Sequence, residues 1–120
     1  MNVLYIIRCL YRKLLKENAP LRTVIVEDVP GSIEPGVLYL LGISEKPWAA
    51  VFQCPCRCGA TIELNLLPEI RPHWQARRHW DSSPSLWPSV NRFVGCRSHF
   101  WLQEGLIQWV PAENKWRGGH

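Results

Sequence analysis

The chain has 120 residues, which is the length of one ordinary domain and is enough to bury a hydrophobic core. Hydrophobic residues make up 47% of it and charged residues 20%, a composition that excludes an intrinsically disordered chain. The formal net charge is +4. This mild positive excess is compatible with a nucleic acid or an acidic protein partner, but an ordinary solvated surface carries such a charge as well.

Residues 2–17 are predicted to form an amphipathic helix that ends near Asn18, before Pro20. Apolar side chains recur at helical spacing, while Arg and Lys side chains lie mostly on the other face. The apolar positions are Val3, Leu4, Ile7, Leu10, Tyr11, Leu14 and Leu15. We expect this helix, within residues 1–20, to pack on the domain or to dock on a partner or a membrane surface.

The pattern changes after residue 20, where β-branched and alternating apolar residues replace the helical spacing. Strands are predicted at residues 23–26, 37–41, 48–52 and 61–66. The last two flank a cysteine-rich turn, so we expect a hairpin that carries the cysteines at its tip.

The second half of the chain is less regular. Residues 68–92 contain four prolines and are predicted to form either a long ordered loop with short strands or a lid. A final hairpin is predicted from residues 96–102 and 106–110, around a turn at Glu104-Gly105.

These elements predict a mainly β fold of the α+β class. We expect a small antiparallel sheet of hairpins, stabilised by zinc, with the amphipathic helix at its N-terminus. The β domain is assigned to residues 21–110, and residues 111–120 to a flexible tail.

The cysteines indicate both the compartment and the chemistry. The chain has five of them, and its N-terminal apolar run is interrupted by Arg8 before it reaches the length of a secretion signal. No segment approaches the roughly 20 apolar residues that a membrane span needs. We therefore expect a cytoplasmic protein without a membrane span, whose reduced thiols bind metal rather than form disulfides.

Two separate turns offer metal ligands at spacings that suit zinc. The first holds Cys54, Cys56 and Cys58, and the second holds Cys96 and His99. One zinc ion takes four ligands, so five candidates leave one over. Cys54, Cys96 and His99 are the preferred ligands, with either Cys56 or Cys58 as the fourth. If His99 does not bind, both of these cysteines do.

The zinc is predicted to be structural. Glu63 and Glu104 lie near the two turns, but neither stands in an HExxH or HxE context that would provide a general base. The leftover cysteine is expected to be an inert buried thiol, and a reactive thiol beside the metal is the alternative.

A serine-rich segment, residues 81–89, precedes the second turn, with His79 close by. It lacks a GxSxG elbow, and Ser, His and Asp so close in sequence rarely form a catalytic triad. We therefore expect its serines to serve turns and caps. A candidate pocket beside the metal is formed by Trp74, Trp80, Ser85, Ser89 and Trp101.

Basic and aromatic residues also alternate between positions 71 and 80. They are Arg71, His73, Trp74, Arg77, Arg78, His79 and Trp80. This pattern is compatible with binding single-stranded nucleic acid through stacking and phosphate contacts. The total charge is modest for a dedicated nucleic-acid-binding protein, so this remains the less favoured interpretation.

Several of these motifs, in this order, resemble a family of small bacterial zinc-binding proteins of unknown function. The family pattern is a CPCxCG turn leading into an alternating strand, then a Trp, a Ser-Leu-x-Pro-Ser element, and a CxSHFW hairpin that ends in a glycine turn. The matching stretches are residues 54–66, Trp80, residues 85–89, and residues 96–101 with Gly105. The resemblance covers residues 37–110.

The resemblance implies a zinc-binding, mainly β domain. Some members are encoded beside bacterial ubiquitin-like proteins, E1-like activating enzymes and JAB-type peptidases. The expected partner is therefore a protein, namely a ubiquitin-like protein or its activating or conjugating enzyme. The expected function is that of an adaptor or accessory factor, either ligase-like or a recognition module. The alternatives are an enzyme that uses a zinc-bound water or a free cysteine, and a nucleic-acid-binding module.

Overall fold

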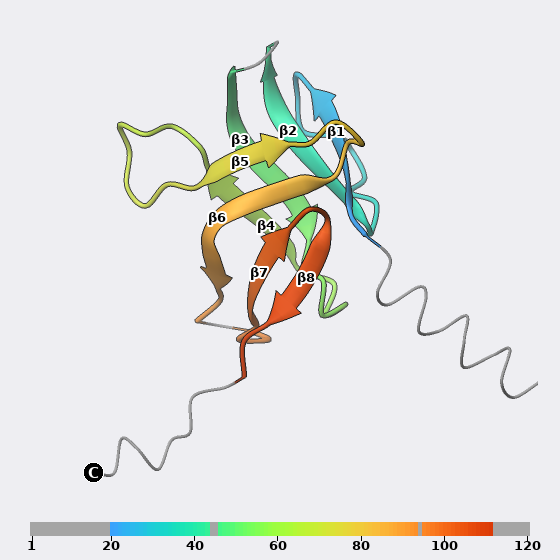
Figure 1. The fold of residues 1–120 in the computed structure, drawn as a ribbon, viewed down its shortest axis with the longest axis vertical. Helices are drawn as coiled ribbons and strands as arrows, with labels where there is room; N and C mark the ends of the chain where they lie inside the picture. The colour runs from blue at the N-terminus through green and yellow to red at the C-terminus, as the bar shows by residue number, and fades with distance from the viewer. Residues whose placement is uncertain (1–19, 44–45, 94, 112–120) are drawn as a thin grey trace, which may run out of the picture.

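The computed structural model describes residues 20–43, 46–93 and 95–111, which form eight strands in two four-stranded sheets. The first sheet has the order β1 (Arg22–Val26), β2 (Val37–Ile43), β3 (Lys46–Gln53), β4 (Thr61–Asn65). The second has the order β5 (Gln75–Arg78), β6 (Pro84–Asn91), β7 (His99–Gln103), β8 (Leu106–Trp109). The second sheet lies across the first (Figure 1). The predicted N-terminal helix and C-terminal tail fall outside the described residues.

The main core lies between the two sheets. The first sheet contributes alternate side chains of β2, β3 and β4, and the second contributes alternate side chains of β6 and β7. These residues are Leu38, Leu40, Ala50, Phe52, Ile62, Leu64, Leu86, Val90, Phe100 and Leu102. Phe52 meets Phe100 edge to face at its centre, with ring centroids 6.3 Å apart.

The first sheet is covered on its other face as well, which explains why β2 is apolar at nearly every position. Val37, Tyr39 and Leu41 are buried there, beneath the connection between β1 and β2. The side chain of Gln53 fixes this connection by donating a hydrogen bond to the carbonyl oxygen of Ile33 at 2.7 Å.

The predicted strands and hairpins of the first half are confirmed, including the hairpin of β3 and β4 around the cysteine turn. The expected single antiparallel sheet is replaced by two sheets, and β1 pairs with β2 in parallel. Parallel pairing requires the connection to return the chain to the end of the sheet where β1 began, and the ten residues from 27 to 36 are long enough to do so. An antiparallel hairpin needs no such return.

The predicted irregular segment 68–92 contains two strands, β5 and the eight-residue β6. The sequence pattern did not predict these two strands clearly, because the segment contains prolines and proline donates no hydrogen bond to a sheet. Pro84 begins β6, and Pro88 lies within the register irregularity between Leu86 and Val90, where the pairing with β7 is interrupted. No helix among the described residues is long and apolar enough to cross a membrane.

In addition to their shared core, the two sheets are joined at the turn between β7 and β8. The amide of Leu21 donates to the carbonyl oxygen of Gly105 at 2.7 Å, and the amide of Gly105 donates to that of Pro84 at 2.7 Å. Gly105 has φ +81°, and a Cβ atom there would lie 2.8 Å from the oxygen of Leu21. Only glycine therefore fits this position without displacing the backbone.

The central phenylalanine of the core provides a test of this packing. Phe100 is fully buried, so Phe100→Ala should lower the free energy of unfolding by about 3–5 kcal/mol, measured by urea denaturation. Phe93 is 78% exposed and is the matched control, because Phe93→Ala should change this free energy by less than about 0.5 kcal/mol. Equal losses in both variants would contradict the two-sheet core.

Candidate functional site

The first cysteine turn begins where β3 ends. The amide of Cys54 donates to the carbonyl oxygen of Ala60 at 2.9 Å, and the amide of Arg57 donates to that of Cys54 at 3.0 Å. Arg57 and Gly59 have positive φ values of 71° and 90°. These bonds fold residues 54–60 tightly enough to bring three thiols to one side of the turn.

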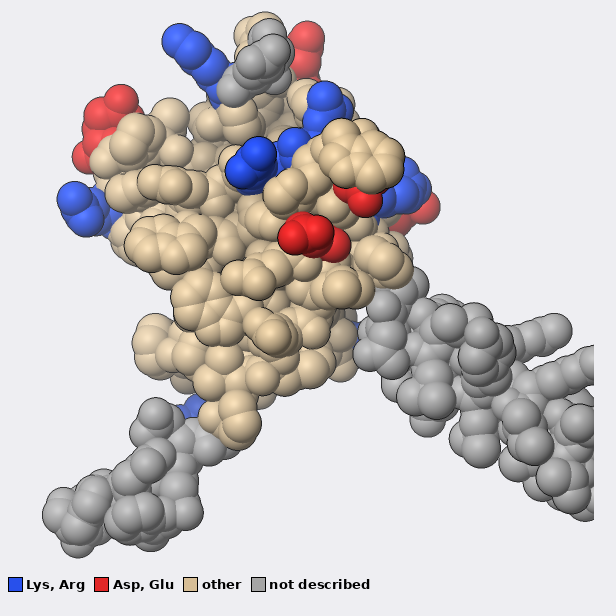
Figure 2. Space-filling view, viewed as in Figure 1, with Lys and Arg blue, Asp and Glu red and all other residues tan. Residues whose placement is uncertain are grey.

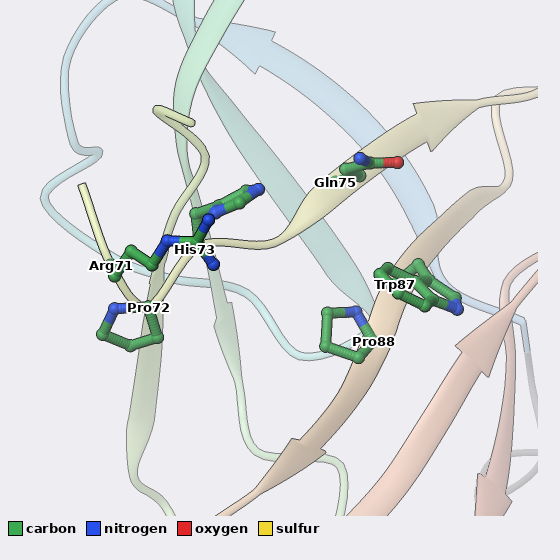
Figure 3. A pocket seen from close by; sticks show the side chains of 6 residues that line it. All are labelled: Arg71, Pro72, His73, Gln75, Trp87 and Pro88. Atoms are coloured by element: carbon green, nitrogen blue, oxygen red, sulfur yellow. The ribbon is translucent and has the colours of Figure 1, made fainter. Parts of the chain in front are cut away.

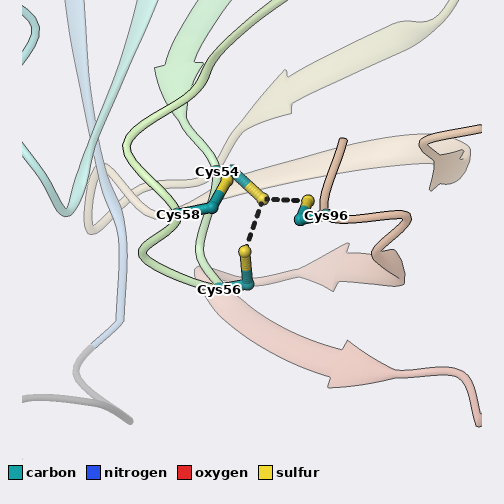
Figure 4. A group of neighbouring side chains, drawn as sticks. All are labelled: Cys54, Cys56, Cys58 and Cys96. Carbon is teal, nitrogen blue, oxygen red and sulfur yellow. Dashed lines mark hydrogen bonds between the residues drawn. The ribbon is translucent and has the colours of Figure 1, made fainter. Parts of the chain in front are cut away.

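The second turn, residues 92–98, connects β6 to β7. It is closed by a hydrogen bond of 2.8 Å from the amide of Arg92 to the carbonyl oxygen of Ser98. Gly95 and Arg97 have positive φ values of 71° and 57°, which reverse the chain around Cys96. The thiol of Cys96 thereby faces the first turn (Figure 4).

Four thiols from the two turns form one cluster. The Sγ atoms of Cys54, Cys56, Cys58 and Cys96 all lie within 4.8 Å of one another. Cys54 Sγ is 3.4 Å from Cys56 Sγ and 3.6 Å from Cys96 Sγ (Figure 4). Tetrahedral thiolates at 2.3 Å from a metal are separated by about 3.8 Å, so the cluster has the size of a four-thiolate metal site. It could hold one metal ion.

Donors around the cluster stabilise thiolates. Ser98 Oγ donates to Cys96 Sγ at 3.1 Å, and Arg92 Nη1 donates to Cys96 Sγ at 3.4 Å and to Cys58 Sγ at 3.8 Å. The hydrogen bond from Ser98 is the main reason that the pKa of Cys96 falls to about 6. Burial raises the pKa of Cys54 to about 12. A bound cation would offset this cost and favour the thiolate of Cys54.

The cluster unites the three cysteines of the first turn with Cys96, but His99 is not one of its members. Instead, His99 Nε2 lies 2.9 Å from the hydroxyl oxygen of Ser89. The structure thus groups both Cys56 and Cys58 with the cluster, which is the arrangement expected if His99 is not a ligand.

Ser89 and His99 form a serine–histidine pair on two adjacent strands, β6 and β7, and both residues are half-buried. The main chain is fixed on both sides of the pair. Trp74 Nε1 donates to the carbonyl oxygen of Ser89 at 3.2 Å, and the amide of Val110 donates to that of His99 at 2.9 Å. A hydroxyl within hydrogen-bond reach of an imidazole is the minimal arrangement for an activated serine nucleophile.

A second serine–histidine pair lies at the hairpin of β5 and β6. His79 Nε2 is 2.7 Å from Ser85 Oγ, and this oxygen also accepts a hydrogen bond of 2.8 Å from the amide of Glu104. Asp81 lies in the same hairpin, where its Oδ1 accepts hydrogen bonds from the amide and hydroxyl of Ser83. These bonds hold the pKa of the Asp81 carboxyl below its usual range.

Two cavities are lined in part by residues of β5 and β6. The larger, of about 500 Å³, is lined by Arg71, Pro72, His73, Gln75, Trp87 and Pro88 (Figure 3). The second, of about 320 Å³, shares Gln75 and Trp87 with it and includes Ser85. Trp87 is therefore a wall common to both cavities.

The predicted pocket residues are distributed among several places. Trp74 lines a third cavity of about 290 Å³, while Trp101 is half-buried on β7. Trp80 is 96% exposed. The predicted pocket left out Trp87, because residues 68–92 were predicted to be largely irregular; once β6 is known, its place next to buried Leu86 marks it as an outward-facing aromatic residue.

Residues 25–110 match the family model described as "Bacterial ubiquitination-like system serine protease (BubE)". This match covers most of the chain, which therefore belongs to the BubE family. The family ties the chain to a bacterial ubiquitination-like system, in agreement with the resemblance seen in its sequence. No curated protein and no solved structure matches the chain significantly.

The thiol cluster predicts one bound metal ion per chain. Cys96 is the only cluster ligand from the second turn, so Cys96→Ser should abolish stoichiometric binding and lower the melting temperature, because metal binding contributes to folding. Elemental analysis and thermal denaturation measure the two effects. The control is Cys9→Ser, which removes the fifth cysteine of the chain, leaves the four clustered thiols intact and should keep the metal. Full metal retention in Cys96→Ser would reject the site.

Arg92 predicts a separate effect on metal retention. Arg92→Ala removes the donor to Cys58 and Cys96, and it should weaken metal affinity by about 10- to 100-fold. Competition with a chromogenic chelator measures this change. Arg77→Ala, an exposed arginine on β5, should leave the affinity unchanged. The role of Arg92 is refuted if the two variants lose metal equally readily.

Proposed function

We propose that this protein is a serine protease of a bacterial ubiquitination-like system, with Ser89 as the nucleophile and His99 as the general base. The observation that carries the proposal is the distance of 2.9 Å between Ser89 Oγ and His99 Nε2. The description of the family as a serine protease supports the same chemistry. This proposal departs from the sequence-based expectation of an adaptor, which assigned these serines to turns and caps.

Ser89 is preferred over Ser85 because of the hydrogen bonds that each hydroxyl makes. Ser85 Oγ accepts the amide of Glu104 while it contacts His79, so one of its lone pairs holds the turn between β7 and β8. Ser89 Oγ makes only one hydrogen bond among the described residues, the one with the ring of His99. Its lone pairs are free for attack on a carbonyl carbon.

The arrangement permits acyl transfer in two steps. With His99 Nε2 unprotonated, the hydroxyl of Ser89 donates to it. Ser89 Oγ attacks the scissile carbonyl carbon while His99 takes its proton, and His99 then delivers that proton to the departing amine. Water next attacks the acyl-enzyme and gives a proton to His99. The ester bond breaks, the carboxylic acid leaves, and His99 returns the proton to Ser89 Oγ.

We assign one zinc ion to the cluster of Cys54, Cys56, Cys58 and Cys96 and give it a structural role. Four thiolates that lie within 4.8 Å of one another suit zinc, which prefers four sulfur or nitrogen ligands in tetrahedral geometry. Four thiolates would fill its coordination sphere and leave no position for a reactive water. They would also leave no free thiol within the cluster. Both features favour serine chemistry over the metal-hydrolase and thiol-enzyme alternatives.

The metal would also help to position the general base. Cys96 and His99 are separated by two residues, and the connection 92–98 is held to the first turn by the thiols and by Arg92. Fixing this connection fixes the start of β7, where His99 stands. The expected substrate is a ubiquitin-like protein or its conjugate, in a reducing compartment such as the cytoplasm.

The test of this function is cleavage of a bacterial ubiquitin-like precursor that carries a C-terminal reporter. Ser89→Ala and His99→Ala should each lower the cleavage rate by about 10³-fold or more, whereas Ser85→Ala and His79→Ala should stay within about tenfold of wild type. Metal content and melting temperature should match wild type in the Ser89→Ala variant, which separates loss of chemistry from loss of fold.

A fluorophosphonate probe gives an independent readout, since it labels activated serines without needing the natural substrate. Mass spectrometry should locate the label on Ser89. Labelling of Ser85, together with loss of cleavage in Ser85→Ala, would transfer the function to the other pair. Tight binding of the precursor without cleavage or labelling would instead support the adaptor function.

A further inference from the structure

The larger cavity adjoins the proposed nucleophile. Pro88 forms part of its wall and immediately precedes Ser89, while the facing wall is the segment 71–73 that leads into β5 (Figure 3). Trp74, the next residue of that segment, bonds the carbonyl oxygen of Ser89. Ser89 thus bonds His99 on β7 through its side chain and Trp74 through its carbonyl oxygen, and both of its neighbours on the cavity side, Pro88 in sequence and Trp74 through this bond, border the cavity wall or follow it directly. A substrate bound at Ser89 has the cavity within reach of its neighbouring residues.

The walls of the cavity combine flat apolar surfaces with positive charge. The indole of Trp87 and the rings of Pro72 and Pro88 supply the apolar part. Trp87 remains 61% exposed, although it stands in the middle of a strand. A large aromatic side chain left open beside a cavity is a frequent anchor for a polypeptide partner.

The face of the molecule shown in Figure 2 carries both basic and acidic side chains. The positive charge at the cavities comes from exposed arginines. Arg71 lines the larger cavity, whose described lining includes no carboxylate, whereas Arg77 lines the second cavity together with Glu104; both arginine side chains are exposed. Neither forms an ion pair with any residue that the structure describes. Arg92 differs from them, because its guanidinium is already engaged by the thiols. An unpaired guanidinium at the edge of a partly apolar cavity is suited to a carboxylate, which it binds through two parallel hydrogen bonds.

We propose that the larger cavity is a substrate subsite that accepts an acidic side chain, Asp or Glu, of the polypeptide being cleaved. Arg71 pairs with the carboxylate, and Trp87 packs against the adjacent part of the substrate. The assignment of a polypeptide substrate rests on the proposed protease function, whereas the preference for an acidic residue rests on the cavity itself. The subsite makes Arg71 a determinant of specificity, with no part in the chemical step.

Binding to the Ser89→Ala variant tests the subsite without requiring catalysis. The probes are two fluorescein-labelled hexapeptide pools of identical apolar composition, one with a central Glu and the other with a central Gln. Fluorescence anisotropy should show about tenfold tighter binding of the Glu pool, as expected for one charge-assisted contact. Adding Arg71→Ala should remove this preference, and adding Arg71→Glu should reverse it in favour of a pool with a central Lys.

Two control variants separate the subsite from general surface effects. Arg22→Ala removes an exposed arginine on β1, in the other sheet, and should keep the preference for Glu. Trp87→Ala should weaken binding of both pools, whereas Trp80→Ala, which removes a tryptophan that is 96% exposed, should change neither. Equal binding of the Glu and Gln pools, or a preference that survives Arg71→Ala, would overturn the proposal.

A short oligothymidylate is the last probe, since a phosphate backbone is also anionic. The proposal would be overturned if this oligonucleotide displaced the Glu pool at a lower concentration than unlabelled peptide does, and if this displacement depended on Arg71. The ligand of the cavity would then be a nucleic acid and not a polypeptide. Cleavage of the same pools by the wild-type protein separates the two inferences. If the preference for Glu depends on Arg71 but no pool is cleaved, the subsite is supported and the protease function is rejected. If the pools are cleaved without any preference for Glu, the protease function is supported and the subsite is rejected.

Discussion

The close approach of two cysteine turns is the contact on which the rest of the structure depends. Cys54 extends from the end of β3 in the first sheet, and Cys96 lies in the connection between β6 and β7 of the second. Their sulfur atoms are 3.6 Å apart, and Cys54 is 2% exposed within the core. This contact joins the two sheets at their cysteine end and, with the hydrogen bond from the amide of Arg92 to the carbonyl oxygen of Ser98, holds the loop between β6 and β7. Apolar packing alone would align the sheets less strictly, because hydrophobic burial has no preferred direction.

The local parts of this arrangement were predictable from the sequence, and the long-range parts were not. The hairpin around Cys54 follows from two alternating strands that flank a compact turn, so pattern and spacing were sufficient. Half of the second sheet, the hairpin of β7 and β8, was predicted, but β6 was missed because Pro84 and Pro88 interrupt its pattern. Proline in a strand is tolerated only where the ladder starts or is irregular, and this depends on the pairing with β7 rather than on the neighbouring residues.

The position of His99 illustrates the same limit at the site. A histidine three residues after a cysteine has the spacing of a zinc ligand, and the sequence offers no reason to separate them. In the structure β7 begins at His99. Its side chain therefore follows the alternation of the strand, with Phe100 turned into the core and His99 turned towards Ser89. The direction of the His99 side chain thus depends on where β7 begins, and strand boundaries are the feature that sequence patterns define least well.

The proposed pair also raises the question of how its histidine is oriented. In a catalytic triad, a carboxylate hydrogen-bonded to the imidazole holds the ring in place. Among the described residues no carboxylate is bonded to the ring of His99. The constraints on His99 come instead from its main chain, through the amide of Val110 on one side and the cysteine turn on the other. An anchored backbone limits the ring to few rotamers and so reduces the entropy lost on forming the bond to Ser89. The thiol cluster would then help to position His99, as the third member of a triad does, without taking part in proton transfer.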